Sequence, residues 1–192
     1  LKVEDAADPT HTVETEALTT QVNTWQTLTF DFANPAAGTA ALNLAYTYNK
    51  ISIFFDFGTT GAAGGGGTFY FDDVLFDTSG GGGGSSFTPI TFDSAAVTYT
   101  LTGFGGAEDA TVVADPTNAS NNVARVVKSA TAELWAGTTV STGANQSVDT
   151  IPFTATSTRM TVRVYSPRAG IPVRLKVEDA ADPTHTVETE AL

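Results

Sequence analysis

The sequence predicts an all-β protein in which antiparallel sheets pack as a β-sandwich. Three observations carry this prediction: short runs rich in Thr, Val, Phe and Tyr, turn residues (Gly, Pro, Asn and Asp) between the runs, and apolar side chains that alternate with polar ones. Patterns typical of helices are nearly absent. With 192 residues, of which 41% are hydrophobic and 16% charged, the chain is long enough to bury one substantial core.

About ten short strands are expected, and each should bury one face and leave the other in water. The residues that share the apolar face are, in chain order, Leu28, Phe30 and Phe32 in 26–32, Ile51, Ile53, Phe55 and Phe57 in 50–57, Met160, Val162 and Val164 in 158–167, Val173, Leu175 and Val177 in 172–179, and Val187 and Ala191 in 184–191. Residues 68–76 (TFYFDDVLF) are strand-like throughout. Together these strands predict the sandwich.

One segment, LKVEDAADPTHTVETEAL, occurs twice without a change, as residues 1–18 and 175–192. The offset of 174 residues (175 minus 1) is a whole-domain period, because solenoid repeats span only about 20–50 residues. A run of five glycines within residues 77–86 is typical of a flexible linker. We therefore expect 1–76 to be the C-terminal portion of one module, 77–86 to be a linker, and 87–192 to be the N-terminal portion of the next.

Two origins fit this arrangement: a stretch cut from a tandem array, which is the simpler one, and an engineered permutant with an overlap. Within one chain, a closed module can use either copy of the repeated segment but not both. The surplus copy is expected to pair with a neighbouring repeat or chain by strand exchange.

The composition excludes several classes of partner and chemistry. The net charge of −12 argues against nucleic acid, which needs a basic surface. No apolar stretch of about twenty residues is present, so membrane insertion is not expected. The chain has no Cys, and His11 and His185 are one position in the two copies, beside a turn. No nucleophile and base are spaced for catalysis, so an enzyme is not expected.

In the order 87–192 followed by 19–76, the chain resembles a β-jelly-roll carbohydrate-binding module of the kind appended to bacterial laminarinase-like and other multimodular extracellular proteins. The motifs that carry the resemblance are ITFDS (90–94), SATAELWAGTTVS (129–141), MTVRVYSPRAGIPVRLKVED (160–179), TWQTLTFDF (24–32) and TFYFDDVLF (68–76). The resemblance implies a jelly-roll topology, a location outside the cell or at its surface, and a polysaccharide partner.

Sugar binding needs an aromatic plane for the pyranose ring and polar groups for its hydroxyls. Trp135, next to a glycine, is the candidate plane. The candidate polar face, together with Tyr165, consists of Arg163, Arg174, Lys176, Glu188 and Glu190. A simpler interpretation of that face, equally weighted, is a row of salt-bridged side chains in water.

The acidic pair Asp72 and Asp73 suggests a second site. Alternation along residues 68–76 sends the two carboxylates to opposite faces, so at least one should lie among apolar neighbours and need a cation or hydrogen-bond donors. Modules of the resembled class often hold a structural Ca²⁺ where first and last strands meet, which implies Asp93 with Asp72 or Asp73 as ligands. A carboxylate hydrogen-bonded to the backbone remains the alternative.

Two functions follow. The first is a non-catalytic module that binds a polysaccharide such as a β-glucan. The second is a structural bead of a tandem-repeat adhesin, surface fibre or filament, joined to neighbouring copies of the same module by strand exchange.

Overall fold

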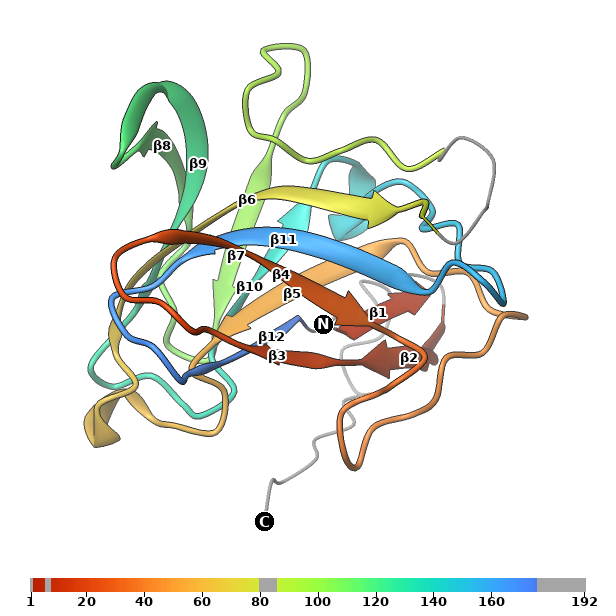
Figure 1. Ribbon diagram of the computed structural model, residues 1–192, viewed down its shortest axis with the longest axis horizontal. Helices are drawn as coiled ribbons and strands as arrows, with labels where there is room; N and C mark the ends of the chain where they lie inside the picture. The colour runs from red at the N-terminus through yellow and green to blue at the C-terminus, as the bar shows by residue number, and fades with distance from the viewer. Residues whose placement is uncertain (1, 6–7, 80–85, 176–192) are drawn as a thin grey trace.

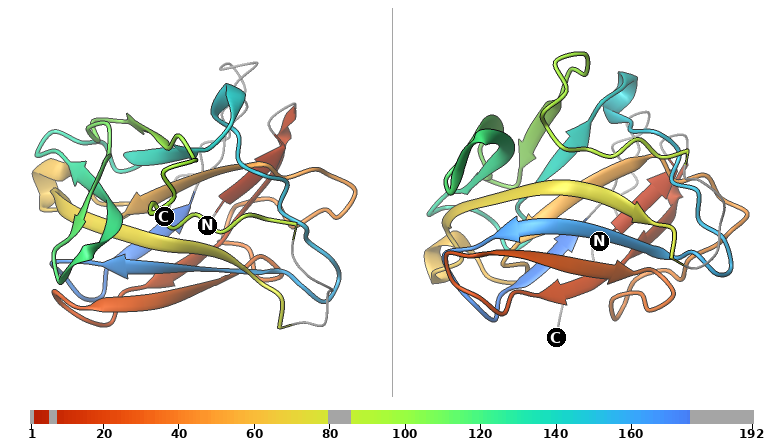
Figure 2. Two further views of the ribbon diagram at one scale, coloured as in Figure 1. Left: turned by 90° about the horizontal axis from the view of Figure 1, so that it is seen from above. Right: turned by 45° about the horizontal axis from the view of Figure 1, so that its top comes forward.

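The computed structural model describes residues 2–5, 8–79 and 86–175, and it shows two antiparallel β-sheets packed face to face (Figures 1 and 2). Sheet A contains β1 (Lys2–Asp5), β2 (Asp8–Glu14), β3 (Glu16–Leu18), β5 (Lys50–Phe55), β7 (Thr100–Phe104), β10 (Gly137–Ser141) and β12 (Pro172–Leu175). Sheet B contains β4 (Trp25–Asp31), β6 (Gly67–Asp77), β8 (Thr111–Asp115), β9 (Asn118–Lys128) and β11 (Arg159–Tyr165). The predicted all-β sandwich is confirmed, whereas the jelly-roll topology stays a prediction.

Two short 3₁₀ turns, η1 (Gly61–Ala63) and η2 (Ala144–Gln146), are the helical elements of the described residues. None of the helical segments in this part of the chain has the length and apolar character to cross a membrane.

The core lies between the sheets and follows the predicted alternation. Along β11, Met160, Val162 and Val164 are buried, and the residues between them are partly exposed. β5 lies in the middle of sheet A, between β10 on one side and β1 and β12 on the other, and it is buried on both faces: Ile51, Ile53 and Phe55 belong to the core, and Lys50, Ser52 and Phe54 on the opposite face are at most 1% exposed. Each fully buried aliphatic or aromatic side chain contributes about 1.5–3 kcal/mol of transfer free energy, which makes this layer the main source of stability.

In each sheet, strands from before residues 77–86 pair with strands from after them. In sheet A, β5 pairs with β1 and also with β10, and in sheet B, β11 pairs with both β4 and β6. The described residues before and after the glycine run therefore build one sandwich. The segment 2–18 contributes three strands to sheet A.

Two local features break the predicted alternation. Asp56 has a positive φ of 51°, which ends β5 and turns Phe57 to the side of Phe54, so the expected common face of Ile51, Ile53, Phe55 and Phe57 is wrong at its last member. Asp73 has a φ of 48° and forms a β-bulge in β6, where two residues lie between Asp72 and Leu75 but only one between their partners Arg163 and Thr161. Beyond the bulge, Val74 faces the core in place of Asp73.

Candidate functional site

The predicted sugar-binding residues lie on two different faces. Arg163 and Tyr165 belong to β11 and face outward from sheet B, whereas Arg174 belongs to β12 and faces outward from sheet A. Residues 166–171 carry the chain from one sheet to the other, so the expectation of one shared face is wrong. Trp135 lies in the loop before β10, on the sheet A side, and Lys176, Glu188 and Glu190 lie outside the described residues.

The outer face of sheet A carries a row of aromatic rings. Trp135 is 37% exposed and lies nearly parallel to Phe104, at 14° and 6.3 Å between ring centroids. Phe104 contacts Phe54, and Phe54 contacts Phe57, both at 5.5 Å and edge to face. The Arg174 guanidinium lies 4.0 Å from the Phe57 ring centroid at the far end. The row therefore crosses the sheet from Trp135, its exposed end, to Arg174, and both Phe54 and Arg174 are buried.

Gly137 allows two of these rings to meet. It lies on β10 opposite Phe104, and a Cβ at this position would lie 2.7 Å from Phe104 Cζ and 2.8 Å from Phe54 Cδ1. Such distances are far inside van der Waals contact, so a side chain here would push the rings apart. The glycine thus lets the aromatic row continue across the strand.

Arg174 forms the polar end of the row. Its Nε donates a hydrogen bond to Glu16 Oε2, and its Nη1 lies 3.8 Å from Glu14 Oε2. Glu14 and Glu16 stand in the first copy where Glu188 and Glu190 stand in the second. The two glutamates beside Arg174 are thus those of the first copy, at the positions that correspond to the predicted Glu188 and Glu190.

The outer face of sheet B holds a compact charged cluster around Arg163. Its Nη2 donates to Asp115 Oδ2 at 2.8 Å and lies 3.6 Å from Asp72 Oδ2, while its Nε lies 3.8 Å from Asp73 Oδ2. The guanidinium also lies 4.2 Å from the Trp25 ring centroid. Arg163 is therefore held by three carboxylates and an indole.

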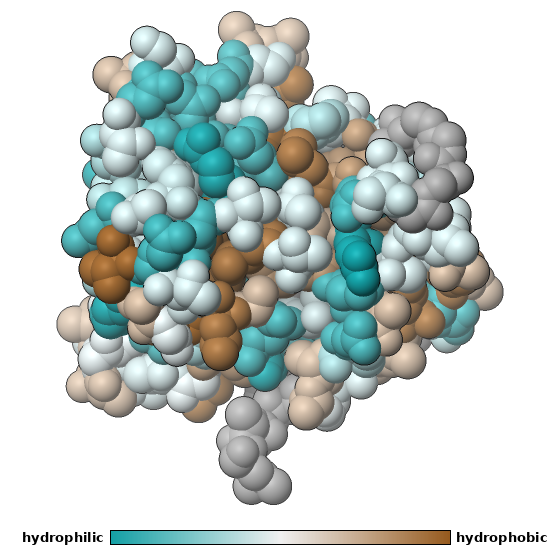
Figure 3. All heavy atoms as spheres, in the orientation of Figure 1, coloured by the Kyte–Doolittle hydropathy of each residue, from teal (hydrophilic) through white to brown (hydrophobic). Residues whose placement is uncertain are grey.

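The β8–β9 hairpin covers this cluster. Asp115, at the end of β8, accepts a hydrogen bond from Trp25 Nε1 at 3.0 Å, although β4 and β8 are opposite edges of sheet B. Asn121 on β9 donates to Asp72 Oδ2 at 2.9 Å. The hairpin curls over the sheet in Figure 1, and hydrophilic side chains gather over it in Figure 3. This covering explains why Asp72 is buried although it faces away from the core.

The two buried carboxylates of the cluster have opposite pKa shifts. Burial raises the pKa of Asp72 to about 6, and the hydrogen bond from Asn121 offsets only part of this effect. Burial also acts to raise the pKa of Asp115, but hydrogen bonds from Thr117, Trp25 and Asn121 outweigh it and lower the pKa to about 2. Asp115 is thus the permanent anion that holds Arg163.

Replacement of Asp72 by Asn should remove a pH dependence of stability. In the folded protein Asp72 keeps its proton up to about pH 6, whereas in the unfolded chain it ionises near 3.8. Between these values the folded state binds the extra proton, so the free energy of unfolding should fall by about 2–3 kcal/mol as the pH rises from about 4 to about 6. Urea unfolding across this range should show the fall in the wild type and its loss in Asp72→Asn. Asp73→Asn, at a 39% exposed side chain, is the control that should keep most of the fall, since the charge of Asp73 is a smaller cause of the raised pKa than burial is. An equal fall in Asp72→Asn would contradict the assignment.

The predicted calcium ligands are engaged within the protein. Asp72 and Asp73 flank Arg163, and Asp93 accepts hydrogen bonds from the backbone N–H of Asn122 at 2.9 Å and from its side-chain amide at 3.0 Å. Over residues 2–5, 8–79 and 86–175, no three His, Asp or Glu side chains are grouped to hold a metal ion. A calcium ion would compete with Arg163 for the same carboxylates. Calcium at these residues stays a prediction.

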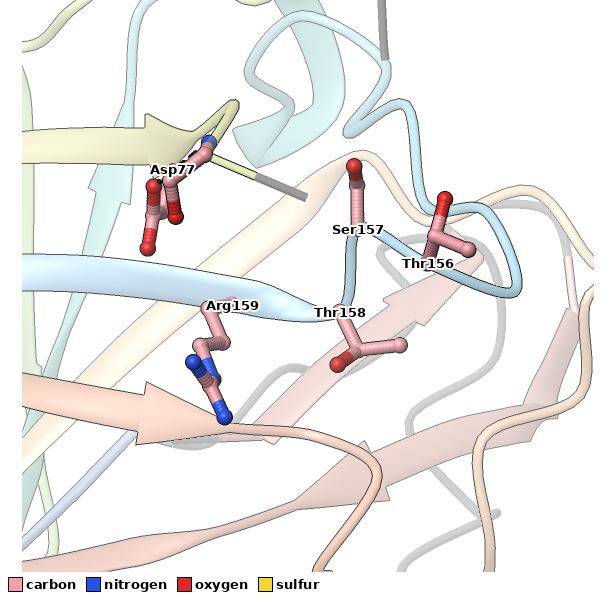
Figure 4. A pocket seen from close by; sticks show the side chains of 6 residues that line it. Asp77, Thr156, Ser157, Thr158 and Arg159 are labelled. Atoms are coloured by element: carbon pink, nitrogen blue, oxygen red, sulfur yellow. Dashed lines mark hydrogen bonds between the residues drawn. The ribbon is translucent and has the colours of Figure 1, made fainter. Parts of the chain in front are cut away.

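Sequence reasoning missed a small polar hollow at the end of sheet B (Figure 4). It has a volume of about 190 Å³ and is lined by Asp77, Ser79, Thr156, Ser157, Thr158 and Arg159. Asp77 and Arg159 are register partners on β6 and β11, and Arg159 is tied to Asp31 at 3.0 Å. The lining offers hydrogen-bond groups but no aromatic ring, and its volume is below the about 300 Å³ at which ligand pockets begin.

No family model matches the chain, and no curated protein or solved structure shows significant similarity to it. The resemblance to carbohydrate-binding modules therefore stays a prediction. The geometry of the two sheet faces is the basis on which a function can be proposed.

Proposed function

We propose that this protein binds an extended polysaccharide, such as a β-glucan, along the outer face of sheet A and does not cleave it. The observation that carries the proposal is Trp135, which is 37% exposed at the open end of an aromatic row that runs through the buried Phe54 to Phe57 and Arg174. The C–H face of a pyranose ring packs on an aromatic plane, and charged planar groups hydrogen-bond its hydroxyls.

Trp135 is the centre of the proposed site. Its indole lies offset from Phe104 and nearly parallel to it, and more than a third of the residue is exposed to solvent. The sheet B face supports binding less well, because Trp25 is less exposed than Trp135 and the Arg163 guanidinium lies against its ring. A polysaccharide ligand places the site of action outside the cell.

Trp135→Ala should weaken binding to a soluble β-glucan by about 10- to 100-fold, because loss of an exposed aromatic anchor removes about 1–3 kcal/mol of binding free energy. Isothermal titration calorimetry and affinity electrophoresis provide the measurement. Trp25→Phe is the matched control, since it changes the tryptophan of the opposite sheet and should leave the affinity unchanged. Unchanged binding by Trp135→Ala would contradict the site, and absence of binding to every polysaccharide by the wild type would contradict the function.

A second candidate function, a bead in a tandem array, is favoured by the way β12 and β1 lie end to end along β5. In an array with a period of 174 residues, the repeated segment would link these strands directly in each module. A protein lengthened by one period should then contain a second sandwich with the same melting temperature. Loss of cooperative melting in the longer protein would contradict the bead.

A further inference from the structure

β1 and β12 lie along β5 as if they were one strand. The last pair of β12 is Leu175 with Ile53, and the first pair of β1 is Lys2 with Ser52. Ile53 and Ser52 are consecutive, so the register passes from β12 to β1 without a step. Along β5, Lys2 therefore occupies the position expected of the residue that follows Leu175.

The neighbouring strands on the other side show the same continuity. Arg174 of β12 pairs with Glu16 of β3, and Lys2 of β1 pairs with Glu14 of β2. Glu14 lies two residues before Glu16, and the residue after Leu175 lies two residues after Arg174. The antiparallel register therefore continues from the β12–β3 pair into the β1–β2 pair without a shift. The position of Lys2 is fixed independently by both neighbours as that of the next residue of β12.

The residue after Leu175 is Lys176, and residues 176–192 repeat 2–18 letter for letter. The continuation of β12 would therefore bring the same side chain to every position that residues 2–18 occupy in sheet A. Val177 would stand for Val3 and Val187 for Val13, and both Val3 and Val13 are fully buried members of the core. We call the place in sheet A that residues 2–18 fill the repeat slot.

We propose that residues 176–192 of the same chain are a second occupant of the repeat slot and can replace residues 2–18 strand for strand. This inference is independent of polysaccharide binding. We expect residues 176–192 to come from the same chain, because Leu175, which precedes them, already pairs with β5 at the edge of the slot.

The two closed states should have nearly equal stability. Each fills the slot with the same side chains and leaves one break in the backbone: between Leu175 and Lys2 in one state, and between Leu192 and Thr19 in the other. The anchors on both sides are outside the exchanged segment: Thr19 N donates to Ile171 O at 3.1 Å, and Val173 pairs with Phe55. The slot thus exists whichever copy fills it.

Paired lysine substitutions in the full chain test this inference. Val3→Lys disables one copy and Val177→Lys the other, because each would bring a charge to a core position. Each single variant should melt within about 2 °C of the wild type, since the intact copy fills the slot, whereas the double variant should melt lower by about 10 °C or more. Leu18→Lys, Leu192→Lys and their double variant are the controls; Leu18 is 55% exposed, so all three should melt like the wild type.

Hydrogen exchange with mass spectrometry identifies the occupant. In Val3→Lys, amide protection should be found in 176–192 and lost from 2–18, and in Val177→Lys the reverse. The proposal is overturned if Val3→Lys alone melts as low as the double variant. Delivery by the same chain is overturned if Val3→Lys sediments as a dimer or larger species.

Discussion

Lys128→Met is expected to lower the free energy of unfolding by about 3 kcal/mol or more. The Lys128 ammonium is buried and donates to three carbonyl oxygens, of Phe55 at 3.2 Å, Asp56 at 2.8 Å and Thr59 at 2.8 Å. Burial lowers the pKa of Lys128 to about 8, so the amine still carries its proton at neutral pH. Methionine fills a similar volume but leaves the three carbonyls without their cation.

Urea unfolding of Lys128→Met, followed by circular dichroism, measures this loss. The Lys128 side chain joins β9 of sheet B to the end of β5 of sheet A, so its removal loosens one end of the sandwich. Arg125→Met is the matched control, because Arg125 lies on the same strand and is exposed. Equal unfolding midpoints for Lys128→Met and Arg125→Met would show that the buried ammonium contributes nothing.

Arg163→Met is expected to destabilise the protein by about 3 kcal/mol near pH 8, because it leaves two buried carboxylates without their cation. Asp115 and Asp72 have side-chain exposures of 2% and 1%, and both are ion-paired to Arg163. The loss should be smaller near pH 5, since the pKa of Asp72 is about 6 and this carboxyl then takes up a proton.

Arg159→Met is the control for this variant, because its ion pair with Asp31 is formed by a 54% exposed side chain. An exposed pair of this kind contributes about 0–1 kcal/mol. The glucan affinity of folded Arg163→Met should equal that of the wild type, since Arg163 acts on the opposite sheet. If Arg163→Met were fully stable but did not bind glucan, Arg163 would belong to the sugar-binding site and the assignment to a stabilising cluster would be wrong.

The alternation of apolar and polar residues was sufficient to predict the sandwich and most of its core. Met160, Val162 and Val164 face inward as the pattern requires. The pattern failed where single residues adopt a positive φ, at Asp56 and Asp73, because such a turn or bulge resets the alternation and leaves no periodic signal.

The candidate site was predicted only in part. Trp135 and Arg174 do lie on one face, but Arg163 and Tyr165 do not, because local pattern cannot show that the chain changes sheets between β11 and β12. The rings that join Trp135 to Arg174 come from β5, the turn after it and β7, and only tertiary structure brings them together. Gly137 was a possible signal, since a glycine inside a strand often marks a close approach.

The two tryptophans allow one measurement to test the sheet A site most directly. Trp135 lies on the sheet A side and Trp25 on the outer face of sheet B, so their two indole N–H signals report on the two faces separately. Titration of the ¹⁵N-labelled protein with a β-glucan oligosaccharide should shift the Trp135 signal and leave the Trp25 signal in place. A shift of Trp25 alone, or of neither signal at saturating oligosaccharide, would contradict polysaccharide binding along sheet A.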